Sequence, residues 1–358
     1  PLILMCSAIP GGHRVPAASL QPESDLRDML VTRGVGPLSP DDIMRALDAG
    51  VAAAETMIAT GLIVSAALHL AGTTRTTGNA VSSAHLAAVK ANGLTLRVGN
   101  EAFRAKVNAS SDPAALGPQD AVICTLKATG LPSFAESLRP LLANDTAVVF
   151  AQNGVPWWYD IGLAPSHPPV PDLAFLDPGG RLRAAIPKQL IVGGVVFSSN
   201  EVVAPGLVAN LSPERNRLLI GECDDRASAR IERLRATLGD ASITSPPVTR
   251  IRETIWSKPL TNMSMSVLCL LTGQTARAVR DDPALQDVIP RLLDEANGVA
   301  QSCFPDVKRV TRSGPAPDHK PSILQDYELG RAMEIDTLVR APAAFARDPK
   351  LVWEWYDW

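Results

Sequence analysis

Two unbroken apolar runs with a helical stretch between them define the middle of the chain. Residues 121–126 (AVICTL) and 147–151 (AVVFA) contain no charge, as expected of strands covered on both faces of a parallel sheet. Residues 131–142 place their large apolar side chains on one helical stripe. A strand, a helix and a strand with short links predict a βαβ unit. Similar apolar runs predict further strands at residues 190–198 and 217–221.

The chain before these strands is predicted to be mainly helical, after an irregular start. Prolines and a Gly-Gly pair interrupt the apolar clusters of residues 1–45. Helical composition follows up to about residue 72, and a short helix over residues 84–90 is expected to stop at Asn92-Gly93. Residues 94–98 alternate between apolar and polar types, which predicts a strand.

The pattern changes again in the last third of the chain. Residues 155–189 form a Pro/Gly-rich insertion that carries Trp157-Trp158. After about residue 247 only helical segments are predicted, near residues 249–273, 282–304 and 322–347. We therefore expect an α/β protein in which a parallel-sheet domain is followed by an all-helical domain.

Length supports this division, because 358 residues are more than one hydrophobic core commonly organises. We expect four segments: an irregular extension over residues 1–45, the sheet domain over 46–247, the helical domain over 248–350 and a tail over 351–358.

Composition narrows the function. The net charge of −3 and the lack of a basic block argue against partners such as nucleic acid or an anionic membrane surface. The five cysteines are scattered without a C-x-x-C pair, which favours a reducing, cytoplasmic location, and we predict no metal site. No apolar run approaches the roughly 18 residues of a membrane span, and residues 2–5 are too short for a signal sequence.

Lys258 and Asn262 stand out because they interrupt an apolar stretch four positions apart. On a helix this spacing puts an ammonium and a carboxamide on one face. Two interpretations are open: a functional pair, or a lysine that extends to solvent beside a satisfied asparagine. Pro259 directly follows the lysine, so it could mark a kink that re-aims the side chain.

Polar groups also follow the two central strands. Lys127 comes directly after residues 121–126, and Gln152-Asn153-Gly154 follows the next strand. Ligands of open parallel sheets sit at the carboxyl ends of strands, so a cation and an amide there suit a ligand with phosphate or ribose groups. The alternative is turn chemistry alone.

A third polar group lies in the last helical segment. Ser322 with Gln325 has the spacing of a capping box at a helix start. Ser322, Asp326 and Glu334 fall near one face of a continuous helix. The two carboxylates could equally belong to a solvated stripe.

Taken together, these motifs resemble the ketopantoate reductase (2-dehydropantoate 2-reductase) family from about residue 61 to residue 347. No single motif is specific, but their order and spacing together are fairly specific for the family, less so for the substrate. The motifs are His85-Leu86 with Asn92-Gly93-Leu94, Asp112-Pro113 with Leu116-Gly117, Leu126-Lys127, Gln152-Asn153-Gly154, Trp256-x-Lys258-x-x-x-Asn262, and Ser322-x-x-x-Asp326 with Arg331-x-x-Glu334-Ile335-Asp336.

The resemblance implies a Rossmann-like dinucleotide-binding domain followed by a helical substrate and dimerisation domain. It also implies a small 2-keto acid substrate, 2-dehydropantoate, with NADPH or alternatively NADH as cofactor, and a possible homodimer. Lys258 matches the family's catalytic proton donor. The implied substrate-binding residues are Asn262, Ser322 and Asn153. The implied cofactor-binding residues are Lys127, Asn153, Glu334 and Gly61.

The chemistry implied by the resemblance is coherent. Hydride transfer to a ketone leaves an alkoxide, which needs a proton and a positive charge nearby. A lysine whose pKa is lowered by burial supplies both.

The chain departs from the family before residue 62. Counting back from Gly61, three positions of the family's G-x-G-x-x-G turn hold Glu55, Met57 and Thr60. Side chains there would block close approach of a diphosphate, and Glu55 would add negative charge. A homologue that is catalytically inactive or binds nucleotide weakly, and that has a binding or scaffolding role, is therefore the alternative.

Further departures affect cofactor and substrate contacts. Residues 79–85 carry no arginine for an NADP 2′-phosphate, and Arg75 and Lys90 are the nearest cations. Ser266 replaces a second family asparagine, and Arg340 stands where a glycine is usual.

Overall fold

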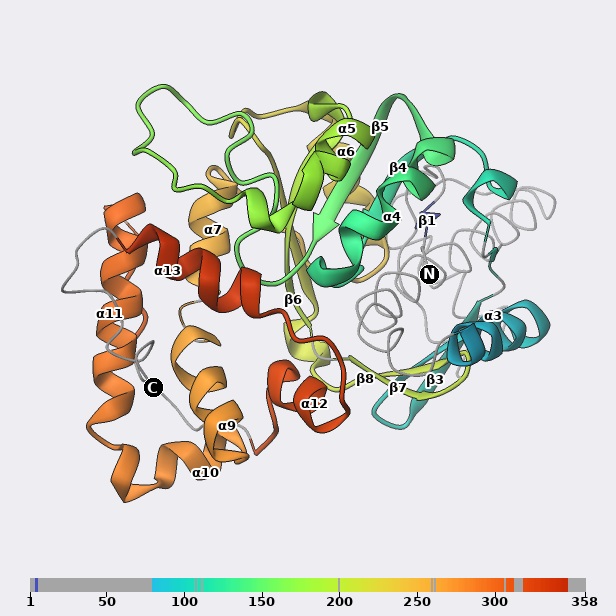
Figure 1. The fold of residues 1–358 in the computed structure, drawn as a ribbon. Coiled ribbons are helices and arrows are strands. Elements are labelled where there is room, and N and C mark those ends of the chain that lie inside the picture. Colours follow the sequence, from blue (N-terminus) through green and yellow to red (C-terminus); the bar gives the residue numbers. More distant parts are fainter. Residues whose placement is uncertain are drawn as a thin grey trace, which may run out of the picture.

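A five-stranded sheet forms the centre of the protein, as the computed structural model shows in Figure 1. The structure describes residues 4–5, 79–105, 107, 109–110, 112–198, 200–258, 260, 262–305, 307–311 and 318–346. The strand order is β1 (Leu4–Met5), β4 (Gln119–Cys124), β5 (Leu142–Ala151), β6 (Ile191–Phe197) and β9 (Arg217–Glu222). Strands β4, β5 and β6 are parallel, and β1 and β9 are antiparallel edge strands.

Side chains of alternate positions in these strands enter two different cores. In β5, Val148 and Phe150 join one core, which includes α4 (Leu131–Leu138), whereas Val149 joins the other, which includes α6 (Ala229–Asp240). Helices thus cover both faces of the sheet, and the uncharged runs within β4 and β5 are buried because water reaches neither face. The prediction of a parallel sheet with a βαβ unit is confirmed.

A second, four-stranded sheet was not predicted. Its order is β3 (Glu101–Ala105), β2 (Leu94–Val98), β8 (Leu207–Asn210) and β7 (Asn200–Ala204). All four strands have only four or five residues, and β2, β3 and β7 are partly exposed, so none of them shows a long apolar run. Gly206, with a φ of 75°, supplies the left-handed turn between β7 and β8. The predicted strand over residues 94–98 exists, in this separate sheet.

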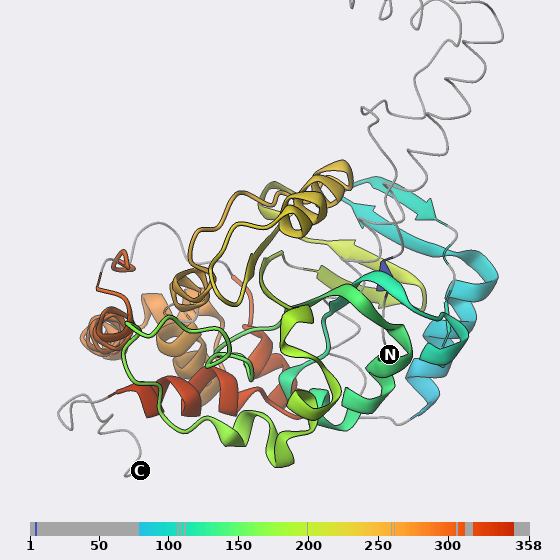
Figure 2. The same cartoon turned by 90° about the horizontal axis from the view of Figure 1, so that it is seen from above.

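Helix α3 (Asn79–Asn92) packs beside the small sheet through Val89. It starts before the predicted residue 84 and ends where expected, because Gly93 adopts a left-handed φ of 76°. In both views the small sheet and α3 lie at the end of the molecule opposite the helical region (Figure 1, Figure 2).

The helical region follows α6, and no strand follows Glu222 among the described residues. The predicted helical segments near residues 249–273, 282–304 and 322–347 are present, but the first and the last are divided into shorter helices. The elements are α7 (Ile251–Ser257), a π-helix (Asn262–Ser266), α9 (Val267–Thr272), α10 (Ala276–Asp281), α11 (Val288–Cys303), α12 (Ser322–Glu328), a second π-helix (Asp336–Arg340) and α13 (Ala341–Phe345).

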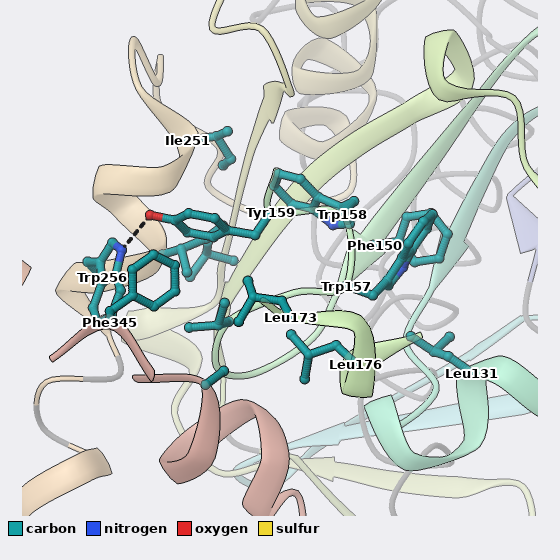
Figure 3. Close-up of a cluster of buried hydrophobic side chains, with 14 of the residues drawn as sticks. Leu131, Phe150, Trp157, Trp158, Tyr159, Leu173, Leu176, Ile251, Trp256 and Phe345 are labelled. Atoms are coloured by element: carbon teal, nitrogen blue, oxygen red, sulfur yellow. Dashed lines mark hydrogen bonds between the residues drawn. The ribbon is translucent and has the colours of Figure 1, made fainter. Parts of the chain in front are cut away.

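The first residues of the predicted insertion over residues 155–189 are buried in the hydrophobic core. It contains 3₁₀ turns and α5 (Arg181–Ala185), and its Trp157, Trp158 and Tyr159 are at most 2% exposed. Figure 3 shows these rings between the sheet and the helical region, where the Trp256 indole nitrogen donates to the Tyr159 hydroxyl at 2.8 Å.

Arg252 of α7 is 1% exposed and completes this junction. Its guanidinium donates to the carbonyls of Tyr159 at 2.7 Å, Cys223 at 2.6 Å and Ile161 at 2.5 Å. These bonds replace the hydration that the buried charge loses. Helix α7 is thereby fixed to the segment that leaves β5.

None of the helices in the described ranges is long and apolar enough to cross a membrane.

Tyr159→Phe tests the junction. The substitution keeps the ring but leaves the buried indole N–H of Trp256 without its acceptor, so we expect the free energy of unfolding to fall by about 1–3 kcal/mol. Urea denaturation measures it. Tyr327→Phe is the matched control because Tyr327 is 62% exposed, and it should change stability by less than about 0.5 kcal/mol. Equal effects of the two changes would contradict the assigned role of the hydroxyl.

Candidate active site

Lys258 directly follows α7, and its ammonium lies at the carboxyl ends of β5 and β6. Nζ donates to Oδ1 of Asn153 at 2.6 Å and to the carbonyl oxygen of Val196. Strand β6 pairs with β5 only as far as Gly194, because β5 ends at Ala151. The Val196 carbonyl therefore lies beyond the end of that ladder and can accept the ammonium.

The environment of this ammonium favours its neutral form. Burial lowers the pKa of Lys258 from 10.5 to about 8, and the carboxylate of Glu334 partly opposes this by favouring the charged form. A lysine with such a pKa can hold a proton near neutral pH and release it to a developing oxyanion. The sequence-based alternative, a lysine extended to solvent, is inconsistent with these contacts.

Glu334 is the second buried charge of the site, at 6% exposure. Burial raises the pKa of its carboxyl group, while hydrogen bonds from the backbone N–H of Ala128 (3.1 Å to Oε1) and from the Asn153 side chain lower it. Asn153 thus bridges Lys258 and Glu334, accepting through its oxygen and donating through its nitrogen.

Lys127, at the end of β4, forms an ion pair with Asp326 of α12. The Lys127 side chain is 17% exposed and that of Asp326 only 5%. The interpretation of Asp326 and Glu334 as a solvated stripe is therefore wrong. The two carboxylates hold the turn after β4, one through the Lys127 ammonium and the other through the Ala128 amide.

Ser322 is the first residue of α12 and is exposed. The predicted capping box is wrong, since Pro321 is the N-cap, no side chain caps this helix, and Gln325 donates instead to the Lys320 carbonyl at 2.7 Å. Ser322, Asp326 and Glu334 do not share a helical face, because α12 ends at Glu328 and a left-handed Gly330 follows.

The structure describes the predicted site residue Asn262 only in part, and the predicted site residue Gly61 not at all. Asn262 begins a π-helix, and its side chain, like Gly61, lies outside the described residues. Helix α7 ends at Ser257, before Pro259, so Lys258 and Asn262 do not sit on one continuous α-helix.

The sequence assigned Gly154 only to a turn, but in the structure this glycine also lets the backbone of Thr337 approach closely. Its φ is 79°, and a Cβ there would lie 2.3 Å from the carbonyl oxygen of Thr337. The Val155 N–H donates to that same oxygen at 2.9 Å. A side chain at position 154 would push the second π-helix away from the end of β5.

Gln152 joins the ends of β4 and β5. Its Nε2 donates to the carbonyls of Cys124 at 2.9 Å and Leu126 at 3.3 Å. Its Oε1 is buried and has no hydrogen-bond partner among the described residues. Such an orphaned acceptor beside Asn153 suits a ligand that brings a donor to the sheet edge.

Comparison with known proteins identifies the family of this chain. A family model described as ketopantoate reductase PanE/ApbA matches residues 59–161, and its C-terminal counterpart matches residues 250–352. A 2-dehydropantoate 2-reductase of Mesorhizobium japonicum is 37% identical over 269 residues, which span 74% of this chain and 82% of that relative. The chain belongs to the ketopantoate reductase family.

Solved structures support the family fold. A Ralstonia solanacearum MolK2 protein assigned as a ketopantoate reductase has a TM-score of 0.63 and 30% identity, covering 80% of this chain and 89% of that one. The 2-dehydropantoate 2-reductase of Geobacter metallireducens GS-15 has a TM-score of 0.57 and 24% identity, covering 72% and 81%. The prediction of a Rossmann-like sheet domain followed by helices is confirmed.

The N-terminal part has a different match. Residues 4–76 match a model described as AbpE bacteria, which overlaps the start of the ketopantoate reductase match at residue 59. Strand β1 is antiparallel to β4, so its carboxyl end does not lie at the sheet edge that carries Lys127 and Asn153.

Lys258→Met tests the lowered pKa through stability. The folded pKa of about 8 lies below 10.5, so between these values the unfolded chain binds more protons than the folded chain. The unfolding free energy of the parent protein should therefore rise relative to Lys258→Met as pH increases from 8 to 10.5, by about 1–3 kcal/mol after allowance for solvent screening. As pH falls through 8 this gain is lost.

Urea denaturation across this pH range measures the difference. Lys188→Met, at an exposed position, is the control and should show a constant offset. A flat difference for Lys258→Met would exclude the proposed environment of the amine.

Proposed function

We propose that this protein reduces a small 2-keto acid, 2-dehydropantoate, to the corresponding 2-hydroxy acid, pantoate, with NADPH as cofactor and NADH as the alternative. The observation that carries the proposal is the ammonium of Lys258, held by Asn153 and the Val196 carbonyl at the strand ends, with a pKa of about 8. The family relatives named as 2-dehydropantoate 2-reductases support the substrate.

The residues at the sheet edge fit a nicotinamide dinucleotide. The carboxyl ends of β4, β5 and β6 are where parallel sheets bind such ligands, and the orphaned oxygen of Gln152 is an acceptor there. A D-mandelate dehydrogenase structure with NADH shares the fold at 17% identity and a TM-score of 0.54. In the proposal Lys127, Asn153, Glu334 and Gly61 contact the cofactor, which when bound supplies the hydride for the keto carbon.

Lys258 then acts at the keto oxygen. As the carbonyl carbon receives the hydride, its oxygen gains negative charge, and the ammonium stabilises that charge and transfers one proton to it. The products are the hydroxy acid, the oxidised cofactor and a neutral amine, which regains its proton from solvent. Asn153 holds the amine in place, and the nearby charge of Glu334 favours its protonated form between turnovers.

Ser322 and Asn262 complete the proposal as ligands of the substrate carboxylate and hydroxyl groups. Ser322 is exposed at the first turn of α12, four residues before the buried Asp326 that binds Lys127. A hydroxyl at this point is free to meet an incoming carboxylate. We also propose that the sheet and helical domains divide near residue 247, that the protein forms a homodimer through the helical domain, and that it is cytoplasmic.

A second candidate is a family member that binds nucleotide weakly and serves as a binding or scaffolding protein. The observation that favours it is the N-terminal sequence, in which Glu55, Met57 and Thr60 stand at glycine positions and the family match begins only at residue 59. NADPH fluorescence titration separates the two candidates. An enhanced, blue-shifted signal favours the reductase, and no signal at millimolar cofactor favours the second candidate.

Substitution of Lys258 tests the proposed function directly. We expect Lys258→Ala to lower kcat for 2-dehydropantoate reduction by about 10²-fold or more, the usual scale of general acid catalysis. Lys258→Arg should also lose turnover, because arginine keeps the charge but does not release its proton. The assay follows NADPH absorbance with ketopantoate as substrate, and Lys188→Ala is the control. Unchanged turnover in Lys258→Ala would remove this lysine from the mechanism.

A further inference from the structure

The ring of Phe197 is a third neighbour of the Lys258 ammonium. Nζ lies 5.5 Å from the centroid of this ring, over its face. Phe197 is the last residue of β6 and directly follows Val196, whose carbonyl accepts the same ammonium. One strand end therefore offers Lys258 both an oxygen and an aromatic face.

These contacts restrict where the amine can point. An ammonium has three N–H donors, and the described acceptors Asn153 and Val196 take two of them. An aromatic face attracts a cation without using a lone pair, so it can hold the nitrogen while one N–H is left for a ligand. A hydrogen-bonding residue at position 197 would compete for that third proton.

The position of the ring is itself fixed by the sheet. Phe197 pairs with Arg217 across the antiparallel ladder of β6 and β9, and the Arg217 guanidinium carbon lies 5.2 Å from the same ring centroid. The ring is half-buried, and Arg217 is exposed. The charged group that favours the protonated form of the amine is Glu334, while Arg217 shares the same ring.

We propose that Phe197 is a positioning residue for the proton-donating lysine: its ring holds the ammonium against the end of β6 and stabilises its charged form. This inference rests on the proposed reductase function, and it assigns to Phe197 no contact with the reacting atoms.

The first test is Phe197→Leu, which keeps apolar volume but removes the aromatic face. A cation over an aromatic face is stabilised by about 0.5–2 kcal/mol, so its loss should lower the pKa of Lys258 by about 0.4 to 1.5. NMR of protein labelled at the lysine Cε measures that pKa, with Lys258→Met identifying the signal. This readout requires no enzymatic activity.

The matched control is Phe175→Leu. Phe175 is also half-buried and also lies beside a cation, with the Arg340 guanidinium carbon 4.0 Å from its ring centroid. It should leave the titration of Lys258 unchanged. Phe197→Tyr keeps the aromatic face and should restore the parent value, which a merely space-filling role would not require.

The inference also predicts how the pH dependence of kcat changes in Phe197→Leu. The proton donor works only when charged, so the alkaline limb of the kcat profile should move to lower pH in Phe197→Leu by the same amount as the NMR titration. We expect kcat at pH 8 to fall about 2- to 16-fold, the loss of protonated donor that this shift from a pKa of about 8 produces, while KM changes by less than about 2-fold.

Incorporation of 3,4,5-trifluorophenylalanine at position 197 covers the case in which Phe197→Leu does not fold. Fluorine withdraws charge from the ring face and nearly preserves its shape, so the pKa of Lys258 should again fall. The inference is overturned if fluorination, or Phe197→Leu, leaves this titration equal to that of Phe175→Leu. If the parent protein reduces no 2-keto acid with either nicotinamide cofactor, the proposed function fails, while the titration still decides whether the ring holds the amine.

Discussion

Burial of the Arg252 guanidinium is the constraint on which the arrangement of the site depends. Its three bonds to backbone carbonyls, together with the bond between Trp256 and Tyr159, fix α7 to the segment that leaves β5. Because α7 ends at Ser257, the same contacts determine where Lys258 emerges. An unpaired charge in this core would cost several kcal/mol, so the helix has few alternative positions.

The charged groups of the site form two linked pairs. Lys127 is neutralised by Asp326, and Lys258 faces Glu334 through Asn153. The first pair joins the end of β4 to α12, and the second joins the ends of β5 and β6 to the segment before the second π-helix. Asp326 and Glu334 both belong to the helical region, whereas their partners lie at strand ends of the sheet. The same polar contacts therefore shape the site and join the two regions.

Both π-helices lie beside this junction. The first begins at Asn262, four residues after Lys258, and the second begins two residues after Glu334 and presents the Thr337 carbonyl to Gly154 and Val155. A π-turn widens a helix by one residue and re-aims its backbone groups, and such turns are frequent at functional sites. Neither π-helix was expected from the sequence, because a periodic apolar pattern does not reveal an extra residue in a turn.

The apolar runs of β4, β5 and β6 determined the parallel sheet by themselves, because only strands buried on both faces remain uncharged over such lengths. Lys127 and Asn153 could be placed at strand ends because each follows one of these apolar runs in the sequence. The motifs that contain Lys258, Ser322 and Glu334 contributed to the resemblance to the family. Tertiary structure alone decided the burial of Asp326 and Glu334. Their partners Lys127, Ala128 and Asn153 lie far away in sequence, so only the folded chain shows that these carboxylates are paired inside the protein. The contact of Phe197 with Lys258 is likewise invisible in the sequence, since an aromatic residue at a strand end is ordinarily a core residue until the chain folds an ammonium over its face.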